Sequence, residues 1–138
     1  MLNVLYVDLA RIYLPARRTN KHKEIQLAHM LRLNELIDGN FKDIKSPANY
    51  AKNMFMSEKN LNMICKIILN KTVSIVITDR VILEAKRMLI HTNLNVVQIS
   101  LDLGYMDNSY FTRVFKKTTG ETPLEFRDNY RRRRLKDE

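Results

Sequence analysis

Amide, hydroxyl and cationic side chains gather in one short stretch, from Asp107 to Lys117. In a helix of about 3.6 residues per turn they fall on the face opposite the apolar Phe111, Val114 and Phe115. An amide and a guanidinium can form paired hydrogen bonds with base edges, while hydroxyls and cations can hold phosphates. A solvated amphipathic helix also presents such a face, so the pattern alone leaves both interpretations open. The candidate DNA-binding residues of this stretch are Asn108, Ser109, Thr112, Arg113, Lys116 and Lys117.

The same pattern occurs fifty residues earlier in the chain. A shift of 50 lays Ser57–Lys66 over Asp107–Lys116, so that the apolar Leu61 coincides with Phe111. The segments before these stretches also match, with one extra residue in the second turn. Self-similarity of this kind indicates two copies of one structural unit, here a helix-turn-helix. We call residues 57–69 the first reading helix and residues 107–118 the second reading helix.

Helical signals account for almost the whole chain. Ser46 and Thr122 suit the N-cap of a helix, each is followed by a proline at the first helical position, and Gly104 suits a sharp turn. The segment 74–91 begins with strand-like, β-branched residues, yet its apolar spacing favours one long helix. We therefore predict an all-α fold with seven helices that begin near residues 24, 47, 57, 74, 96, 107 and 122.

Apolar spacing also predicts which residues face the core. In the helix that begins near residue 24 these are Ile25, Ala28, Leu31, Leu36 and Ile37. In the first reading helix they are Leu61, Ile64, Cys65 and Ile68. In the long helix they are Ile75, Thr78, Ile82, Ala85 and Leu89.

The long helix is expected to join the two helix-turn-helix units. About 18 residues at about 1.5 Å each span about 27 Å, which lets the two reading helices lie about one DNA turn, near 34 Å, apart. Residues 1–14 are predicted to form a further short amphipathic helix, with apolar residues at Leu2, Leu5, Leu9 and Ile12. So short a helix needs a packing partner. Residues 15–22 are a predicted linker, 23–134 the double helix-turn-helix domain, and 135–138 a tail.

Charge favours a polyanionic partner. The chain has 24 Lys and Arg against 15 Asp and Glu, a net charge of +9, which suits nucleic acid or an acidic membrane surface. No apolar run approaches the roughly 18 residues needed to cross a bilayer, so we predict no membrane partner. The run Arg131–Arg134 either stays solvated at a helix C-terminus or contacts phosphates.

Catalytic and metal chemistry find no support in the sequence. Cys65 is the single cysteine, which favours a reducing, cytoplasmic setting. It lies between apolar residues, where a thiol usually acts as a small hydrophobic group and not as a nucleophile. The three histidines, His22, His29 and His91, are joined by no thiol or carboxylate cluster. There is no glycine-rich phosphate loop, nucleophile elbow or catalytic carboxylate pair. We therefore predict no enzyme, no metal site and no cofactor.

The stretch RVILEAKRMLIHTNLNVVQISLDLGYMDNSYFTRVFKKTTGETPLEFR, residues 80–127, closely resembles the C-terminal signature of the AraC/XylS family of bacterial transcription regulators. The family pattern runs A..LL..T and then I..IA...GF...SYF.R.FK...G.TP..YR, and nearly every part of it occurs here in order. The resemblance extends over about residues 23–133. It implies a seven-helix DNA-binding domain whose third and sixth helices enter successive major-groove segments on one face of DNA.

Carried over by position, the resemblance assigns base-facing residues in both reading helices. In the second they are Asn108, Ser109, Thr112 and Arg113, and in the first they are Lys59, Asn60, Asn62 and Met63. The cations Lys59 and Lys66 can also hold phosphates. The first reading helix departs from the family, which usually has Arg, Phe and Gly where this chain has Met63, Cys65 and Asn70. Met63 can meet a thymine methyl group but cannot bond the paired acceptors of guanine.

We therefore predict a sequence-specific, DNA-binding transcription regulator, an activator located in the bacterial cytoplasm at the nucleoid. The expected partners are double-stranded DNA, RNA polymerase, and a second copy of the chain bound through the N-terminal helix or a missing sensor domain of a longer regulator. Two alternatives stay open: the DNA-reading module of a DNA-repair alkyl-transfer enzyme, and a protein-interaction module with a basic face. A single cysteine, placed in a reading helix, argues against the repair enzyme.

Overall fold

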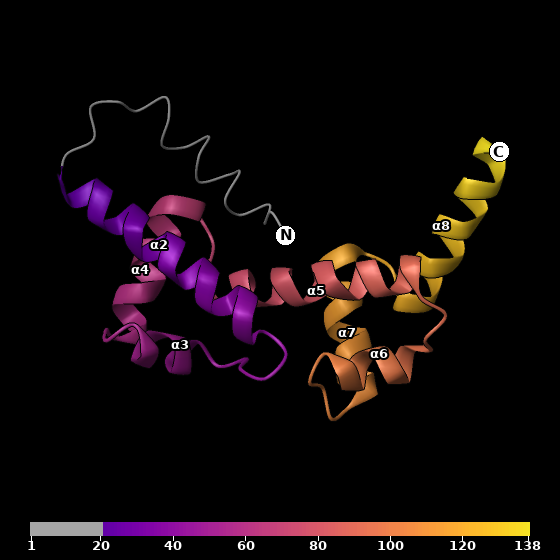
Figure 1. Cartoon of the computed structure of the whole chain (residues 1–138), viewed down its shortest axis with the longest axis horizontal. Helices are drawn as coiled ribbons and strands as arrows, with labels where there is room; N and C mark the ends of the chain where they lie inside the picture. Colours follow the sequence, from indigo (N-terminus) through magenta and orange to yellow (C-terminus); the bar gives the residue numbers. More distant parts are fainter. Residues whose placement is uncertain (1–20) are drawn as a thin grey trace. The chain divides into compact units, whose positions relative to one another are not determined.

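The computed structural model describes residues 21–138, and all of its regular elements are helices (Figure 1). This confirms the predicted all-α fold. The predicted helix 1–14 and most of the predicted linker lie outside the described residues. The helices are α2 (Lys21–Asn40), α3 (Pro47–Asn53), α4 (Glu58–Leu69), α5 (Val73–His91), α6 (Val96–Asp102), α7 (Asn108–Thr119) and α8 (Pro123–Asp137).

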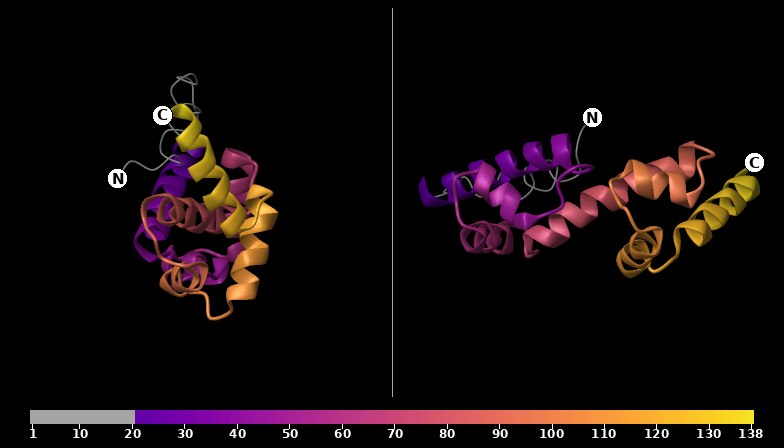
Figure 2. Two further views of the ribbon diagram at one scale, coloured as in Figure 1. Left: turned by 90° about the vertical axis from the view of Figure 1, so that its right-hand side faces the viewer. Right: turned by 90° about the horizontal axis from the view of Figure 1, so that it is seen from below.

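The chain forms two compact units, one ending at Ile77 and the other beginning at Thr78. In the first unit α2, α3 and α4 pack on one another, and in the second α7 packs on both α6 and α8 (Figure 2). The helix α5 contributes residues to both units. Each unit therefore contains one short helix followed by one reading helix, which is the repeat that the sequence predicted.

The core of the first unit lies between α2 and α4. Leu61, Ile64, Cys65 and Ile68 are buried, which confirms the predicted inward face of the first reading helix. The Cys65 thiol lies 3.6 Å from the sulfur of Met30, a residue of α2 that is fully buried. Tyr50 of α3 is also buried, and its hydroxyl donates a hydrogen bond to the Ile44 carbonyl at 2.8 Å.

The predicted inward face of α2 is wrong except at Ile37. The residues that α2 buries are Gln26, Met30, Leu33, Asn34 and Ile37, whereas Ile25 is 51% exposed. The predicted residues Ile25, Ala28 and Leu31 are three residues apart, and each such step rotates the side-chain direction by about −60° around the helix axis. Ile25 and Leu31 therefore lie about 120° apart. Steps of four, three and four keep the buried residues on one face, but two of them are polar and did not register as core.

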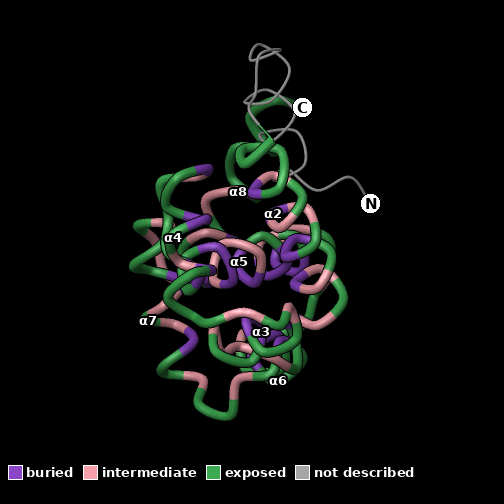
Figure 3. Tube along the Cα trace, turned by 90° about the vertical axis from the view of Figure 1, so that its left-hand side faces the viewer, coloured by how far each residue is buried: buried purple, intermediate pink, exposed green. Residues whose placement is uncertain are grey.

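The helix α5 is continuous from Val73 to His91, so the strand-like start of this segment is helical as predicted. Several of its residues are buried, among them Ile82, Ala85 and Leu89, and Figure 3 shows purple, buried segments at α5. The prediction fails at Ile75, which is 47% exposed, because Val73, Val76 and Ile77 fill the core of the first unit instead. Thr78 is half-buried.

A buried arginine ties α8 to the end of α5. The Arg127 guanidinium donates hydrogen bonds to the carbonyls of Leu89 at 3.0 Å and Thr92 at 3.2 Å. The last carbonyls of a helix have no partner within it, so a cation placed there satisfies them and complements the helix dipole. Arg131 continues the connection by donating to the side-chain oxygen of Asn93 at 3.1 Å.

Between residues 21 and 138 no single helix is both long and apolar enough to span a bilayer. The helices α4 and α5 pass that test only as a pair, and they are bent by 66° at the break between them.

Candidate nucleic-acid interface

Both reading helices have defined starts and ends. The Ser57 hydroxyl accepts a hydrogen bond from the Asn60 amide at 3.1 Å, and the Asp107 carboxylate accepts one from the Ser109 amide at 2.9 Å. These caps satisfy N–H groups that lack a partner within the helix. The helices end at residues in the left-handed conformation, Asn70 with φ 56° and Gly120 with φ 87°. Asparagine tolerates this conformation better than other non-glycine residues, which explains how Asn70 replaces the family's usual glycine.

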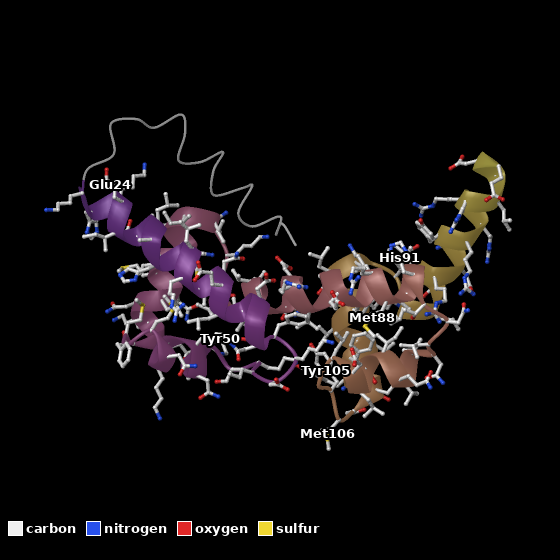
Figure 4. The ribbon with its side chains drawn as sticks, in the orientation of Figure 1. Glu24, Tyr50, Met88, His91, Tyr105 and Met106 are labelled. Atoms are coloured by element: carbon white, nitrogen blue, oxygen red, sulfur yellow. The ribbon has the colours of Figure 1, made fainter. Side chains whose placement is uncertain are left out.

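The turns before the two reading helices differ. Gly104 has φ 86°, as its predicted role in a sharp turn requires. In the first unit the corresponding residue with positive φ is Phe55, at 57°, and its side chain is 97% exposed. The turn before α7 is one residue longer than the turn before α4. It contains Met106, which is 96% exposed and projects from the turn (Figure 4). Nothing in the sequence signalled the strained backbone at Phe55.

The helix α7 presents its polar residues as the sequence predicted. Phe111 and Phe115 are buried and Val114 is half-buried, which confirms the apolar face. Among the candidate residues the exposed ones are Ser109, Arg113, Lys116 and Lys117, and the half-buried ones are Asn108 and Thr112. The Asn108 side-chain oxygen is buried and has no hydrogen-bond partner among residues 21–138. Whether these residues contact bases or phosphates stays a prediction.

The exposed face of α4 is more apolar. Lys59, Asn60 and Lys66 are exposed, but so are Met63 at 50% and Ile67 at 55%. In the repeat of 50 residues, Met63 and Ile67 stand where α7 has Arg113 and Lys117. The first reading helix therefore offers a methionine and an isoleucine at two positions where the second offers cations.

Asn62 has an internal role that the sequence did not reveal. Its side-chain oxygen accepts a hydrogen bond from the Val73 amide at 2.9 Å, and the residue is half-buried. Val73 is the first residue of α5, so its N–H has no partner within the helix. The Asn62 oxygen thus holds the start of α5. Whether Asn62 also faces bases stays a prediction.

The second unit needs no such bond at the equivalent place. A shift of 50 brings Val73 to Pro123, which has no backbone N–H, and Asn62 to Thr112. Because Pro123 begins α8, Thr112 of α7 does not have to accept a hydrogen bond from the next helix, as Asn62 of α4 does.

One neighbour of Arg113 was missed in the sequence. The guanidinium carbon of Arg113 lies 5.9 Å from the centroid of the Tyr110 ring. Residues three apart on a helix surface are neighbours, so the spacing could have suggested this contact.

The buried thiol does not resemble a nucleophile. Cys65 has no exposed surface, and burial raises the pKa of its thiol to about 12. A reactive cysteine needs the opposite, an accessible thiol with a lowered pKa. Within the described part of the chain, no three His, Cys, Asp or Glu residues are placed to hold a metal ion together.

The run Arg131–Arg134 lies on the exposed last turns of α8. Arg131 bonds Asn93, and the Arg134 guanidinium lies 4.0 Å from the Glu138 carboxylate. Both predicted roles, a solvated helix end and a phosphate contact, are compatible with this exposure.

A family profile described as "Helix-turn-helix domain" matches residues 50–129. The Arabinose operon regulatory protein of Escherichia coli (strain K12) is 36% identical over 92 residues, covering 67% of this chain and 30% of the regulator. The chain thus spans about three-tenths of that relative's length.

Solved structures share the fold. The C-terminal domain of AraT, a response regulator from Geobacillus stearothermophilus, has a TM-score of 0.67 at 25% identity and covers 72% of this chain and 83% of that domain. The DNA-binding domain of AdpA, a global transcriptional factor, was solved in complex with a target DNA. It has a TM-score of 0.69 at 16% identity, covering 76% of this chain and 95% of that one.

Proposed function

Because this chain belongs to the AraC/XylS family of helix-turn-helix proteins, we propose that it binds double-stranded DNA sequence-specifically and regulates transcription. The proposed contacts are the major-groove edges of bases and the phosphates beside them. Activation of transcription through a contact with RNA polymerase, in the bacterial cytoplasm, belongs to the same proposal. The family resemblance supports this part of the proposal, and we propose homodimerisation on the same ground.

The observation that carries the proposal is the exposed polar face of α7. A guanidinium at Arg113 stands beside the Ser109 hydroxyl, with Lys116 and Lys117 one turn later, and the opposite face is buried. Arginine can bond both acceptors of guanine, whereas lysine next to it neutralises phosphate charge. A reading helix needs this combination, and a merely solvated helix does not.

The two reading helices are proposed to contribute unequally. Met63 and Ile67 can contact the methyl group of thymine, but they donate no hydrogen bonds. Lys59 and Lys66 supply phosphate contacts on α4. We therefore expect α7 to supply most of the hydrogen-bonded base recognition, and α4 to favour thymine and to anchor the backbone.

Selection of binding sites from random duplexes, followed by titration of the selected site at two salt concentrations, tests this function. A conserved sequence should emerge, and the affinity should fall steeply with salt, by about 0.9 logarithmic units per tenfold rise for each phosphate neutralised. Salt-dependent binding without any enriched sequence would leave a nonspecific DNA binder. Absence of duplex binding would favour the alternative of a basic protein-interaction module.

A further inference from the structure

Tyr110 lies beside the side chain that is proposed to read base edges. The distance of 5.9 Å from the Arg113 guanidinium carbon to the Tyr110 ring centroid is within the about 6 Å over which a cation is attracted to an aromatic face. Tyr110 is 51% exposed, and Arg113 is exposed as well. The pair therefore lies at the surface, where a DNA groove could receive the guanidinium.

The Tyr110 ring is connected to the core by a row of other rings. Its centroid lies 6.0 Å from that of Tyr105, which lies 5.3 Å from that of Phe111. Tyr105, labelled in Figure 4, is half-buried, and burial raises the pKa of its hydroxyl to about 12. Phe111 is fully buried and lies 6.1 Å from Phe115 between ring centroids. We call Tyr110, Tyr105, Phe111 and Phe115 the aromatic row.

The first reading helix has no counterpart to the aromatic residues of α7. At the positions of Tyr110, Phe111 and Phe115, a shift of 50 gives Asn60, Leu61 and Cys65. At the position of Arg113 it gives Met63, which carries no charge to be oriented. The ring and the guanidinium thus occur together in one reading helix and are both missing from the other.

An arginine side chain loses rotamer entropy when it is fixed in one geometry. Confining the side chain before DNA binds reduces the part of that cost that falls on the complex. A tyrosine ring suits this purpose because only two torsion angles need to be fixed, and Tyr105 packs behind it.

We propose that Tyr110 is a positioning residue, which holds the Arg113 guanidinium in the orientation that reads a base edge. The inference rests on the proposed function, because it presumes that Arg113 contacts a base. The aromatic ring performs the task and the hydroxyl does not. Loss of the ring therefore weakens discrimination between bases at the position read by Arg113, and leaves binding to random duplex unchanged.

The experiment uses the full chain and the selected site. Dissociation constants are measured for the wild type, Arg113→Ala, Tyr110→Leu, Tyr110→Phe and the double variant Tyr110→Leu/Arg113→Ala. The duplexes are the selected site, its three single-base changes at the position where Arg113→Ala removes discrimination, and a random duplex. Thermal unfolding of each variant verifies that it is folded.

Tyr110→Leu should reduce the ratio of dissociation constants between the changed and the selected duplexes by about two- to fivefold. This fold-change corresponds to the interaction energy of an exposed cation–aromatic pair. Tyr110→Phe should keep it. With Arg113→Ala already present, Tyr110→Leu should cause no further loss, because there is no guanidinium left to orient.

Four results would overturn the inference. Equal loss on the selected site and on random duplex would make Tyr110 a phosphate contact, and equal losses for the Phe and Leu variants would assign the effect to the hydroxyl. Full discrimination in Tyr110→Leu, with discrimination lost in Arg113→Ala, would refute the positioning role alone. If Arg113→Ala left discrimination intact at every position, the base-reading role of Arg113 would fail as well.

Discussion

Arg113 and Met63 occupy equivalent positions in the two reading helices but differ in the hydrogen bonds that they can donate. A guanidinium presents a planar fork of donors, whereas a thioether presents none. Both side chains are exposed. We therefore expect a difference in recognition that arises from side-chain chemistry at one position of a repeated unit, and single substitutions can test it.

Arg113→Ala should cost about 1–3 kcal/mol on the selected site and relax base choice in one half-site. Met63→Ala should cost less and alter mainly a thymine preference, since only a methyl contact is lost. Lys66→Ala is the control, because it should weaken all duplexes alike and lower the salt dependence. Titration of selected and random duplexes measures all three. Equal losses on both duplexes for Arg113→Ala would identify Arg113 as a phosphate contact instead.

Cys65 provides a prediction about pH. The pKa of its thiol is raised by burial from the ordinary 9.0 to about 12 in the folded chain. The thiolate therefore forms first in the unfolded chain, so the contribution of Cys65 to stability is complete below pH 9 and is lost as pH rises toward 12. A thiol reagent at pH 8 should react slowly until the chain unfolds.

Urea unfolding at pH 8 and pH 10 measures this loss. The free energy of unfolding should decrease from pH 8 to pH 10, and this decrease should be smaller in Cys65→Ala. Part of the decrease should remain in that variant, because the pKa values of Tyr50 and Tyr105 are also raised. Rapid reaction of the thiol in the folded chain would contradict its burial.

The start of α5 depends on a side chain from α4. Asn62→Ala removes the bond to the Val73 amide, so it should lower the free energy of unfolding by about 1 kcal/mol. Thr112→Ala is the matched control at the equivalent position of α7, where the facing residue Pro123 has no N–H to satisfy. It should cost clearly less. Thermal or urea unfolding compares the two, and equal losses would show that the Asn62 bond adds no stability.

The turn before α4 stores strain at Phe55. Left-handed backbone costs a residue other than glycine about 1–2 kcal/mol, and glycine adopts it freely but loses more entropy on folding. Since Phe55 is almost fully exposed, Phe55→Gly sacrifices little packing. It should raise the free energy of unfolding by up to about 1 kcal/mol. A clear loss of stability in the urea titration would mean that the Phe55 side chain contributes to the fold after all.

Helix positions were predictable from sequence where caps and prolines mark them. Thr122 caps α8 as predicted, and Ser57 and Asp107 cap the helices that were predicted to begin near them. Ser46 precedes α3 as predicted, yet its side chain makes no capping bond.

Contacts between elements were harder to predict. The inward face of α2 was missed because Gln26 and Asn34 are buried polar residues, and hydrophobic patterns do not register them. The bond from Asn62 to Val73 joins residues in different helices, so no periodicity reports it. The side chains of α7 could be predicted well because they lie on one helix whose opposite face is strongly apolar.

At the scale of the whole molecule, two units each carry a reading helix, and α5 runs from one unit into the other. A net charge of +9 favours DNA without regard to sequence, so we expect any sequence specificity to come from the reading helices. We propose, as the family resemblance implies, that both helices read one duplex, in successive major-groove segments on the same face.

Hydroxyl-radical footprinting on the selected site tests this claim most directly. We predict two protected segments on one face of the duplex, with centres about 10 base pairs apart. Arg113→Ala should abolish protection in one segment before the other. Protection of a single groove segment, or of segments on opposite faces of the duplex, would contradict the account.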